Sequence, residues 1–248
     1  MADPCILVAE SLYVFCPPKL PPIKLNLMHN LLLAKVPLTF NSRFASITTI
    51  WLFHLSSLVG IYLGYFDWFI TKTPINLTLL GVLLCVQFPI DTKKKIYLTI
   101  FIFIVGMVVE WIGVHYGYIF GTYTYGPNLG PKLDGVPLLI GLNWVILTLS
   151  TAAISSRFIK NNLGKIILGA LLMVGLDVFI EQVTTLLDYW TWEAGSAPLR
   201  NYFSWFLFSL FLHWCYNKLR IKGDFIFSLH LYAAQLTFFV FLYGIYKV

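Results

Sequence analysis

The run IYLTIFIFIVGMVVEWIGVHYGYIF, residues 96–120, is long and apolar enough to cross a lipid bilayer as one helix. A transmembrane helix needs about 20 mostly apolar residues, and Glu110 is the only Asp, Glu, Lys or Arg in this run. Of the 248 residues of the chain, 58% are hydrophobic and 11% are charged, whereas a soluble domain carries about 25% charged residues. This composition predicts an integral membrane protein and excludes a soluble or a disordered chain.

Similar apolar runs follow one another along most of the chain, separated by short polar or Gly/Pro-rich breaks. We therefore expect an all-α fold, a polytopic membrane helix bundle of about seven transmembrane helices that forms one domain over 44–248. The residues before it, 1–43, are rich in proline and are expected to form a loosely ordered N-terminal extension. Besides 96–120, the predicted spans are about 44–66, 74–90, 136–156, 166–189, 202–219 and 225–246.

The basic residues support this count and orient the bundle. When the chain is threaded through seven spans, thirteen of its 17 Lys and Arg residues fall on one side. Cytoplasmic loops carry such an excess, so the N-terminus is predicted to be cytoplasmic and the C-terminus external. Because the net charge of +6 lies in short loops between apolar runs, we expect no nucleic-acid partner. The predicted location is the cell (inner) membrane, crossed several times.

Three of the eleven acidic residues lie inside predicted spans: Glu110, Asp177 and Glu181. A charge at membrane depth costs on the order of 3 kcal/mol and often marks a functional pathway. Asp177 and Glu181 are four residues apart and share one helix face. At about 1.5 Å per residue, Glu110 and Glu181 reach matching depths, where they can hold and deliver a proton. In the alternative interpretation, the acids bond to Asn, Tyr or Trp and only hold the helices together.

The two external loops beside the acidic spans, 121–137 and 191–201, have similar sequences. Each contains a Pro-Leu pair near its end, with a Trp seven residues after the Pro and an Asn in between. This similarity predicts a weak two-helix repeat, as in other membrane folds, in which the acids face each other beneath a lid rich in Tyr and Trp. The matching residues are Pro137, Asn143 and Trp144 in one unit and Pro198, Asn201 and Trp205 in the other.

Aromatic and amide side chains near the acids are the candidate substrate-binding residues. Aromatic faces can stabilise a cationic intermediate, although Tyr and Trp also form the belt of residues at a membrane interface. The predicted substrate-binding set is Tyr123, Tyr125, Asn143, Trp144, Trp190, Trp192, Asn201 and Trp205.

Several other chemistries lack the residues that they need. The chain has no GxGxxG motif for a nicotinamide or flavin, no P-loop and no DDxxD magnesium motif. Its histidines are scattered and form no metal-ligand cluster. The last predicted span has no lysine before Lys247 on which a retinal Schiff base could form. We therefore expect neither a cofactor nor a metal, which leaves acid–base catalysis or a transport role.

Three strings carry a resemblance to a known family: EWIGVHYGYIFGTYTYGPNLGPKLDGVPLLIGLNW at 110–144, LDVFIEQ at 176–182 and YWTWEAGSAPLRNYFSWF at 189–206. They resemble the integral-membrane carotenoid 1,2-hydratases of the CruF-like kind. Together with the hydropathy, the resemblance covers about 44–246. The chain departs from the family pattern at Gln182 and Ala197.

The resemblance implies addition of water across the terminal 1,2 double bond of an acyclic carotenoid end group, of the γ-carotene or lycopene type, to give a tertiary alcohol. It implies no redox cofactor, a carotenoid substrate in the lipid membrane, and other carotenoid-pathway enzymes as partners. Glu110, Asp177 and Glu181 are then the expected catalytic acid–base groups. The alternatives are a lycopene-type cyclase, which starts with the same protonation, and a proton-coupled membrane transporter that uses the acids as a relay.

Overall fold

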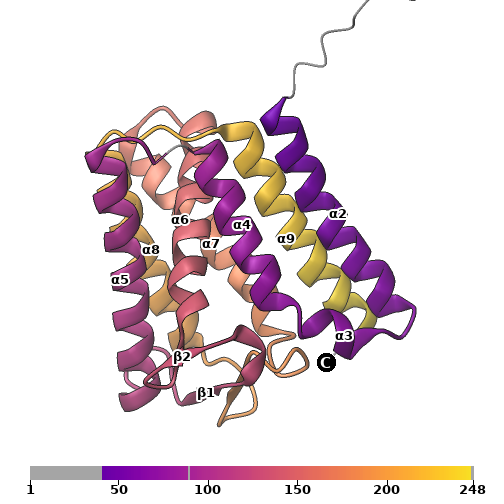
Figure 1. Ribbon diagram of the computed structural model, residues 1–248. Coiled ribbons are helices and arrows are strands. Elements are labelled where there is room, and N and C mark those ends of the chain that lie inside the picture. Colours follow the sequence, from indigo (N-terminus) through magenta and orange to yellow (C-terminus); the bar gives the residue numbers. More distant parts are fainter. Residues whose placement is uncertain (1–40, 89, 247–248) are drawn as a thin grey trace, which may run out of the picture. The chain divides into compact units, whose positions relative to one another are not determined.

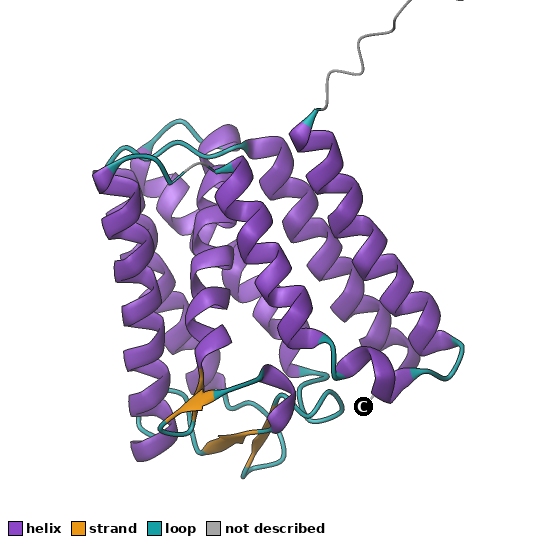
Figure 2. Ribbon diagram, viewed as in Figure 1, coloured by secondary structure: helices purple, strands orange, loops and turns teal. Residues whose placement is uncertain are grey.

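The described part of the chain folds into a bundle of α-helices, as the hydropathy predicts (Figures 1 and 2). The computed structural model describes residues 41–88 and 90–246, so the predicted N-terminal extension lies almost wholly outside the described residues. The long helices are α2 (Ser42–Tyr62), α4 (Thr73–Gln87), α5 (Lys93–Tyr116), α6 (Leu138–Phe158), α7 (Asn162–Glu181), α8 (Leu199–Lys218) and α9 (Phe225–Tyr246), and the short α3 (Phe66–Ile70) lies between α2 and α4.

Among the described helices, α2, α5, α6, α7 and α9 are long and apolar enough to cross a membrane. Helix α4 is apolar but has 15 residues, and α8 has 20 residues with more polar side chains. The polytopic membrane bundle is therefore confirmed. The count of seven spans and the cytoplasmic N-terminus stay predictions.

Four of the predicted spans are too long at their C-terminal ends: those predicted to end at 66, 90, 120 and 189 end as helices at Tyr62, Gln87, Tyr116 and Glu181. The last two are the helices that carry the acids. Helix α5 ends at Tyr116 because Gly117 takes up the left-handed conformation, with φ of 64°, which closes a helix. Helix α7 ends at Glu181 and turns follow it as far as Asp188. The chain therefore folds back over the helix ends that carry the acids, instead of continuing away from them.

Short strands, which the hydropathy does not predict, lie at one end of the bundle, here called the strand end (lower end in Figure 1; orange in Figure 2). Strand β1 (Tyr123–Tyr125) pairs antiparallel with β4 (Trp190–Trp192). Strand β2 (Lys132–Leu133) pairs with β3 (Val136–Pro137), and a 3₁₀ turn, η1 (Pro127–Leu129), precedes them. The β1–β4 pairing joins two loops that lie far apart in the sequence.

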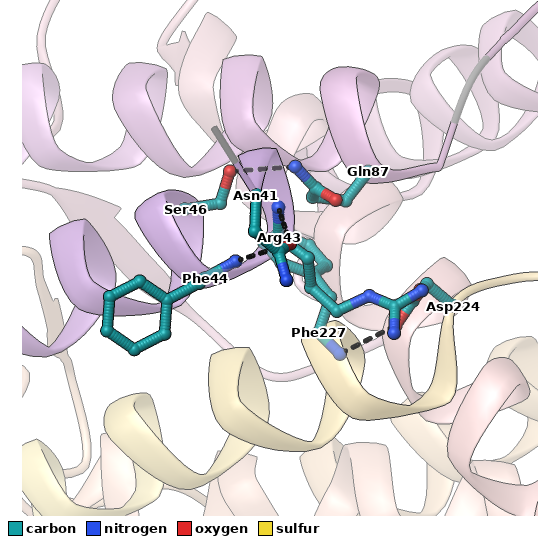
Figure 3. Close-up of polar contacts among 7 residues, drawn as sticks. All are labelled: Asn41, Arg43, Phe44, Ser46, Gln87, Asp224 and Phe227. Carbon is teal, nitrogen blue, oxygen red and sulfur yellow. Dashed lines mark hydrogen bonds and ion pairs between the residues drawn. The ribbon is translucent and has the colours of Figure 1, made fainter. Parts of the chain in front are cut away.

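Helix α6 forms the centre of the bundle. Its residues are buried continuously from Trp144 to Ser155, and it packs against α4, α5, α7, α8 and α9. Helix α2 packs mainly against α9. At the end opposite the strands, the Arg43 guanidinium lies 2.6 Å from the Asp224 carboxylate, and Gln87 Nε2 donates a hydrogen bond to Ser46 Oγ at 2.9 Å (Figure 3). These contacts tie α2 to both α9 and α4 at that end.

Candidate active site

A cavity of about 420 Å³ lies inside the bundle and reaches the strand end. All three predicted acids line it. Of the eight predicted substrate-binding residues, seven line it as well; the exception is Trp144, which is fully buried and stacks on Trp205 with ring centroids 4.2 Å apart. The fold thus gathers almost all of the predicted site around one space.

Glu110 accepts hydrogen bonds from three neutral side chains. Tyr123 and Tyr125 donate their hydroxyls to Oε2 at 2.6 and 2.8 Å, and the Trp144 indole donates to Oε1 at 3.1 Å. Glu110 is 3% exposed, so water contributes little to the solvation of its carboxyl group. The three donors therefore replace the hydration that burial removes.

Glu181, the last residue of α7, accepts a matching set of hydrogen bonds. Trp190 and Trp192 donate their indole N–H groups to Oε2 at 3.1 and 2.7 Å. Asn201 Nδ2 donates to Oε1 at 3.0 Å and also reaches Asp177 Oδ2 at 3.3 Å. Here too every donor is neutral, and within residues 41–88 and 90–246 no Lys, Arg or His forms an ion pair with the acid.

The β1–β4 pairing joins the two acid clusters. Its register sets Tyr123 opposite Trp192 and Tyr125 opposite Trp190, with ring centroids 4.8 and 5.8 Å apart. Each strand is an aromatic-Thr-aromatic triplet whose two aromatic side chains donate to the acid of the preceding helix. The bonding of each acid to an aromatic triplet thus repeats, whereas the third donor differs: it is Trp144 at Glu110 and Asn201 at Glu181. The two-helix repeat itself stays a prediction.

The aromatic residues near this end divide into two groups. The four of β1 and β4 are buried and bonded to the acids. Tyr116 and Tyr118 are 56% and 78% exposed, as expected for a membrane-interface belt. Sequence could not separate these groups, because both consist of Tyr and Trp beside the same helix ends.

The phenols of β1 keep their protons and act as donors. Burial, reinforced by the nearby Glu110 charge, raises the pKa of Tyr123 well above its ordinary value, and the same causes raise the pKa of Tyr125. Burial also raises the pKa of Tyr189 to about 12, and its hydroxyl lies 2.9 Å from Thr73 Oγ1. These groups are therefore neutral over the physiological range.

Asp177 differs from the two glutamates. It is 1% exposed and lines the cavity. Among the described residues, Asn201 is its one hydrogen-bond partner, through Oδ2, so its Oδ1 stays open toward a ligand. Asn143 also lines the cavity and, within the described part of the chain, its amide has no hydrogen-bond partner. These two groups are the open polar positions beside the acids.

Sequence reasoning did not find the part of the cavity wall that comes from distant helices. Residues of α2, α3, α4 and α9 complete it, among them His54, Phe69, Leu80, Gln235 and Phe239. They are mostly apolar and look like ordinary membrane-helix residues, so no local pattern identifies them. Within the described residues, no group of three or more His, Cys, Asp or Glu could hold a metal ion.

The fold and the site define a polytopic helical membrane protein with an acid-lined internal cavity at one end of its bundle. The family model described as "Carotenoid biosynthesis protein" matches residues 73–247, and the chain belongs to this family. The match covers both acidic helices and both strands of the β1–β4 pair. Searches of curated proteins and of solved structures find no match. The family gives the chain a role in carotenoid biosynthesis, and its membrane-spanning helices fit a carotenoid substrate within the lipid.

Proposed function

We propose that the protein is a carotenoid 1,2-hydratase of the cell membrane, a hydro-lyase that adds water to the acyclic end group of a γ-carotene- or lycopene-type carotenoid. The observation that carries this proposal is the set of three carboxyl groups around one cavity, in which the hydrogen-bond donors to Glu110 and Glu181 are all neutral. Protonating an unactivated double bond requires an acid, and capturing the resulting cation requires a base and a placed water.

The hydrogen bonds support a division of labour among the acids. Glu110 and Glu181 each accept three hydrogen bonds, which make each of them easier to ionise than a buried acid with fewer donors. Asp177 accepts one, and it lies beside Glu181 on the same helix. A third negative charge there would be strongly opposed by the other two, so Asp177 is the group suited to carry a proton and deliver it.

The reaction then balances within the site. Asp177 gives its proton to C2 of the terminal double bond, whose π electrons form the new C–H bond and leave a tertiary cation at C1. Water bonds to C1 through its oxygen, and Glu181 takes the proton that this water releases. Proton transfer from Glu181 to Asp177, which share Asn201 as a hydrogen-bond partner, restores the starting state. One water is added, and no oxidant or reductant is consumed.

The surroundings of the acids suit a cationic intermediate. The Glu110 carboxylate and the faces of the β1 and β4 aromatics provide negative potential around the cavity. The paired strands limit the entry of bulk water, which would otherwise compete at the cation. The open amide of Asn143 offers two donors and one acceptor with which to orient the attacking water.

Expression in a lycopene- or γ-carotene-producing bacterium, followed by chromatography and mass analysis of the pigments, tests this function. A product heavier by one water is expected, and Asp177→Asn should lower its formation by at least about 100-fold, the usual scale for a general acid. Glu193→Gln, a change at an exposed acid next to β4 that does not line the cavity, is the matched control. A product of unchanged mass would instead indicate a cyclase, and proton-coupled transport without conversion by the purified protein would indicate a transporter.

A further inference from the structure

The wall of the cavity is closed on most sides and open on one. The lining residues from α5 to α9 and from the strand-end loops are buried or half-buried. The exposed ones all come from a single stretch of chain, α2 to the start of α4: Phe53, Ser56, Trp68, Lys72 and Ile75. The cavity therefore reaches the surface of the described bundle beside α2, α3 and α4.

The opening lies along the length of the helices and not only at their ends. Phe53 is near the middle of α2, and Ser57 is one turn further toward the strand end. At the opposite end, the Gln87–Ser46 hydrogen bond and the Arg43–Asp224 ion pair hold α2 against its neighbours (Figure 3). The opening beside α2 is thus closed at the end opposite the strands, and it extends along the half of α2 nearest the acids.

The chemistry of the rim fits the side of a membrane protein. Phe53, Trp68 and Ile75 are 39%, 59% and 60% exposed, as residues that face lipid tails would be. The Lys72 ammonium lies 5.4 Å from the centre of the Trp68 ring, a pairing typical of the level at which tails meet headgroups. Ser56 and Ser57 donate their hydroxyls to the Phe53 carbonyl at 3.0 and 2.8 Å. They therefore add small side chains to the rim without unpaired polar groups.

The size of the cavity demands such an opening if its ligand is a carotenoid. At about 420 Å³, the cavity lies toward the lower end of the range of roughly 300–1,000 Å³ that pockets for drug-sized ligands span. A carotenoid has roughly 40 carbons, so most of its chain must lie elsewhere.

We propose that the cavity opens sideways to the bilayer through a lateral mouth formed by Phe53, Ser56, Ser57, Trp68, Lys72 and Ile75. The end group of the substrate lies at the acids, and its polyene chain leaves through this mouth into the lipid between α2 and α4. This inference rests on the proposed carotenoid substrate and adds the route by which that substrate enters. Two side chains of α9, Gln235 and Phe238, also line the cavity.

Tryptophan substitutions on α2 test the mouth in protein reconstituted in lipid nanodiscs. Ser57→Trp and Ser56→Trp place a large ring in the mouth. Val59→Trp places the same ring on the same helix at a residue that is 58% exposed and does not line the cavity. Two quantities are measured: the lycopene bound per protein after removal of free pigment, and the initial rate of conversion. A C10 hydrocarbon with the same isopropylidene end serves as a short substrate that fits wholly inside.

Lycopene binding and conversion are expected to fall by at least about tenfold in both serine variants and to stay within about twofold of wild type in Val59→Trp. With the short substrate, the serine variants are expected to convert at close to the wild-type rate. Retention of lycopene binding by Ser57→Trp and Ser56→Trp would refute the proposed lateral mouth. So would equal losses in all three variants, or equal losses for the long and short substrates. Because binding is measured separately, a wild-type protein that binds lycopene without hydrating it would refute the proposed activity and leave the mouth testable.

Discussion

Replacing Glu181 by leucine should destabilise the protein more than replacing Glu110 by leucine, although each acid accepts three hydrogen bonds. The reason is the kind of donor. Two of the donors to Glu181 are indole N–H groups, which cannot accept a hydrogen bond in return. Two of the donors to Glu110 are phenols, which can both donate and accept. The Tyr123 and Tyr125 rings lie 5.4 Å apart, so their hydroxyls can bond to each other.

The expected difference follows from the donors that each change leaves without a partner. Glu181→Leu leaves two indole N–H groups, those of Trp190 and Trp192, without a hydrogen-bond partner. Asn201 still has its bond to Asp177. At about 1–3 kcal/mol for each unsatisfied buried donor, the cost is about 2–6 kcal/mol. Glu110→Leu leaves only the Trp144 indole without any hydrogen-bond partner, at about 1–3 kcal/mol. One phenol can donate to the other, so the accepting phenol loses an acceptor for its O–H but keeps a hydrogen bond through its oxygen. Because both changes remove a carboxyl group of the same size, the costs that they share cancel, and a difference of at most about 1–3 kcal/mol remains.

Glutamine variants give the control. Glu181→Gln keeps one acceptor oxygen for both indoles, and Asn201 can turn its amide to accept from the new amino group. This variant should therefore stay within about 1 kcal/mol of wild type. Equilibrium unfolding of each purified variant in one detergent measures the free energies. A Glu110→Leu variant at least as destabilised as Glu181→Leu would refute the expected order. So would a Glu181→Gln variant that is no more stable than Glu181→Leu.

Three further predictions concern orientation, the strand pair and the attacking water. Alkaline phosphatase fused after Tyr125 should be active and a fusion after Lys94 inactive, because the basic loops are predicted to be cytoplasmic; the reverse pattern would invert the bundle. Gly126→Ala should lower the free energy of unfolding by about 1–3 kcal/mol, because its new Cβ would lie 2.2 Å from the Asp188 carbonyl oxygen. The thermal midpoint checks this against Gly244→Ala, which meets nothing within 4 Å. Asn143→Leu should raise the ratio of isomerised to hydrated carotenoid at equal substrate loss, and an unchanged ratio would remove Asn143 from water positioning.

The helices could be predicted from sequence because the bilayer makes that problem local. A chain inside lipid must satisfy its backbone groups within each segment, so length and hydropathy alone define a span. The seven predicted runs accordingly coincide with α2 and α4 to α9, apart from their ends. The errors lie where a single backbone conformation decides the end, as at Gly117, or where turns replace an expected helix after Glu181.

The candidate acids could be predicted for a related reason. A carboxyl group in an apolar span is costly enough to be conspicuous in sequence, and the spacing of Asp177 and Glu181 sets them on one helix face. Their partners were ambiguous. Tyr and Trp beside a helix end are equally typical of an interfacial belt, and only the β1–β4 register assigns Tyr123, Trp190 and their neighbours to the acids.

Sequence by itself therefore determined the class of fold, the approximate positions of the seven long helices and the choice of three candidate acids, since each depends on a residue's own polarity and its place within one helix. The tertiary structure decided which donors meet each acid, the enclosure of the cavity and its opening beside α2. These depend on pairings such as Tyr123 with Trp192 and on apolar walls from separate helices. Side chains with no distinctive chemistry of their own acquire a role there only through the neighbours that packing gives them.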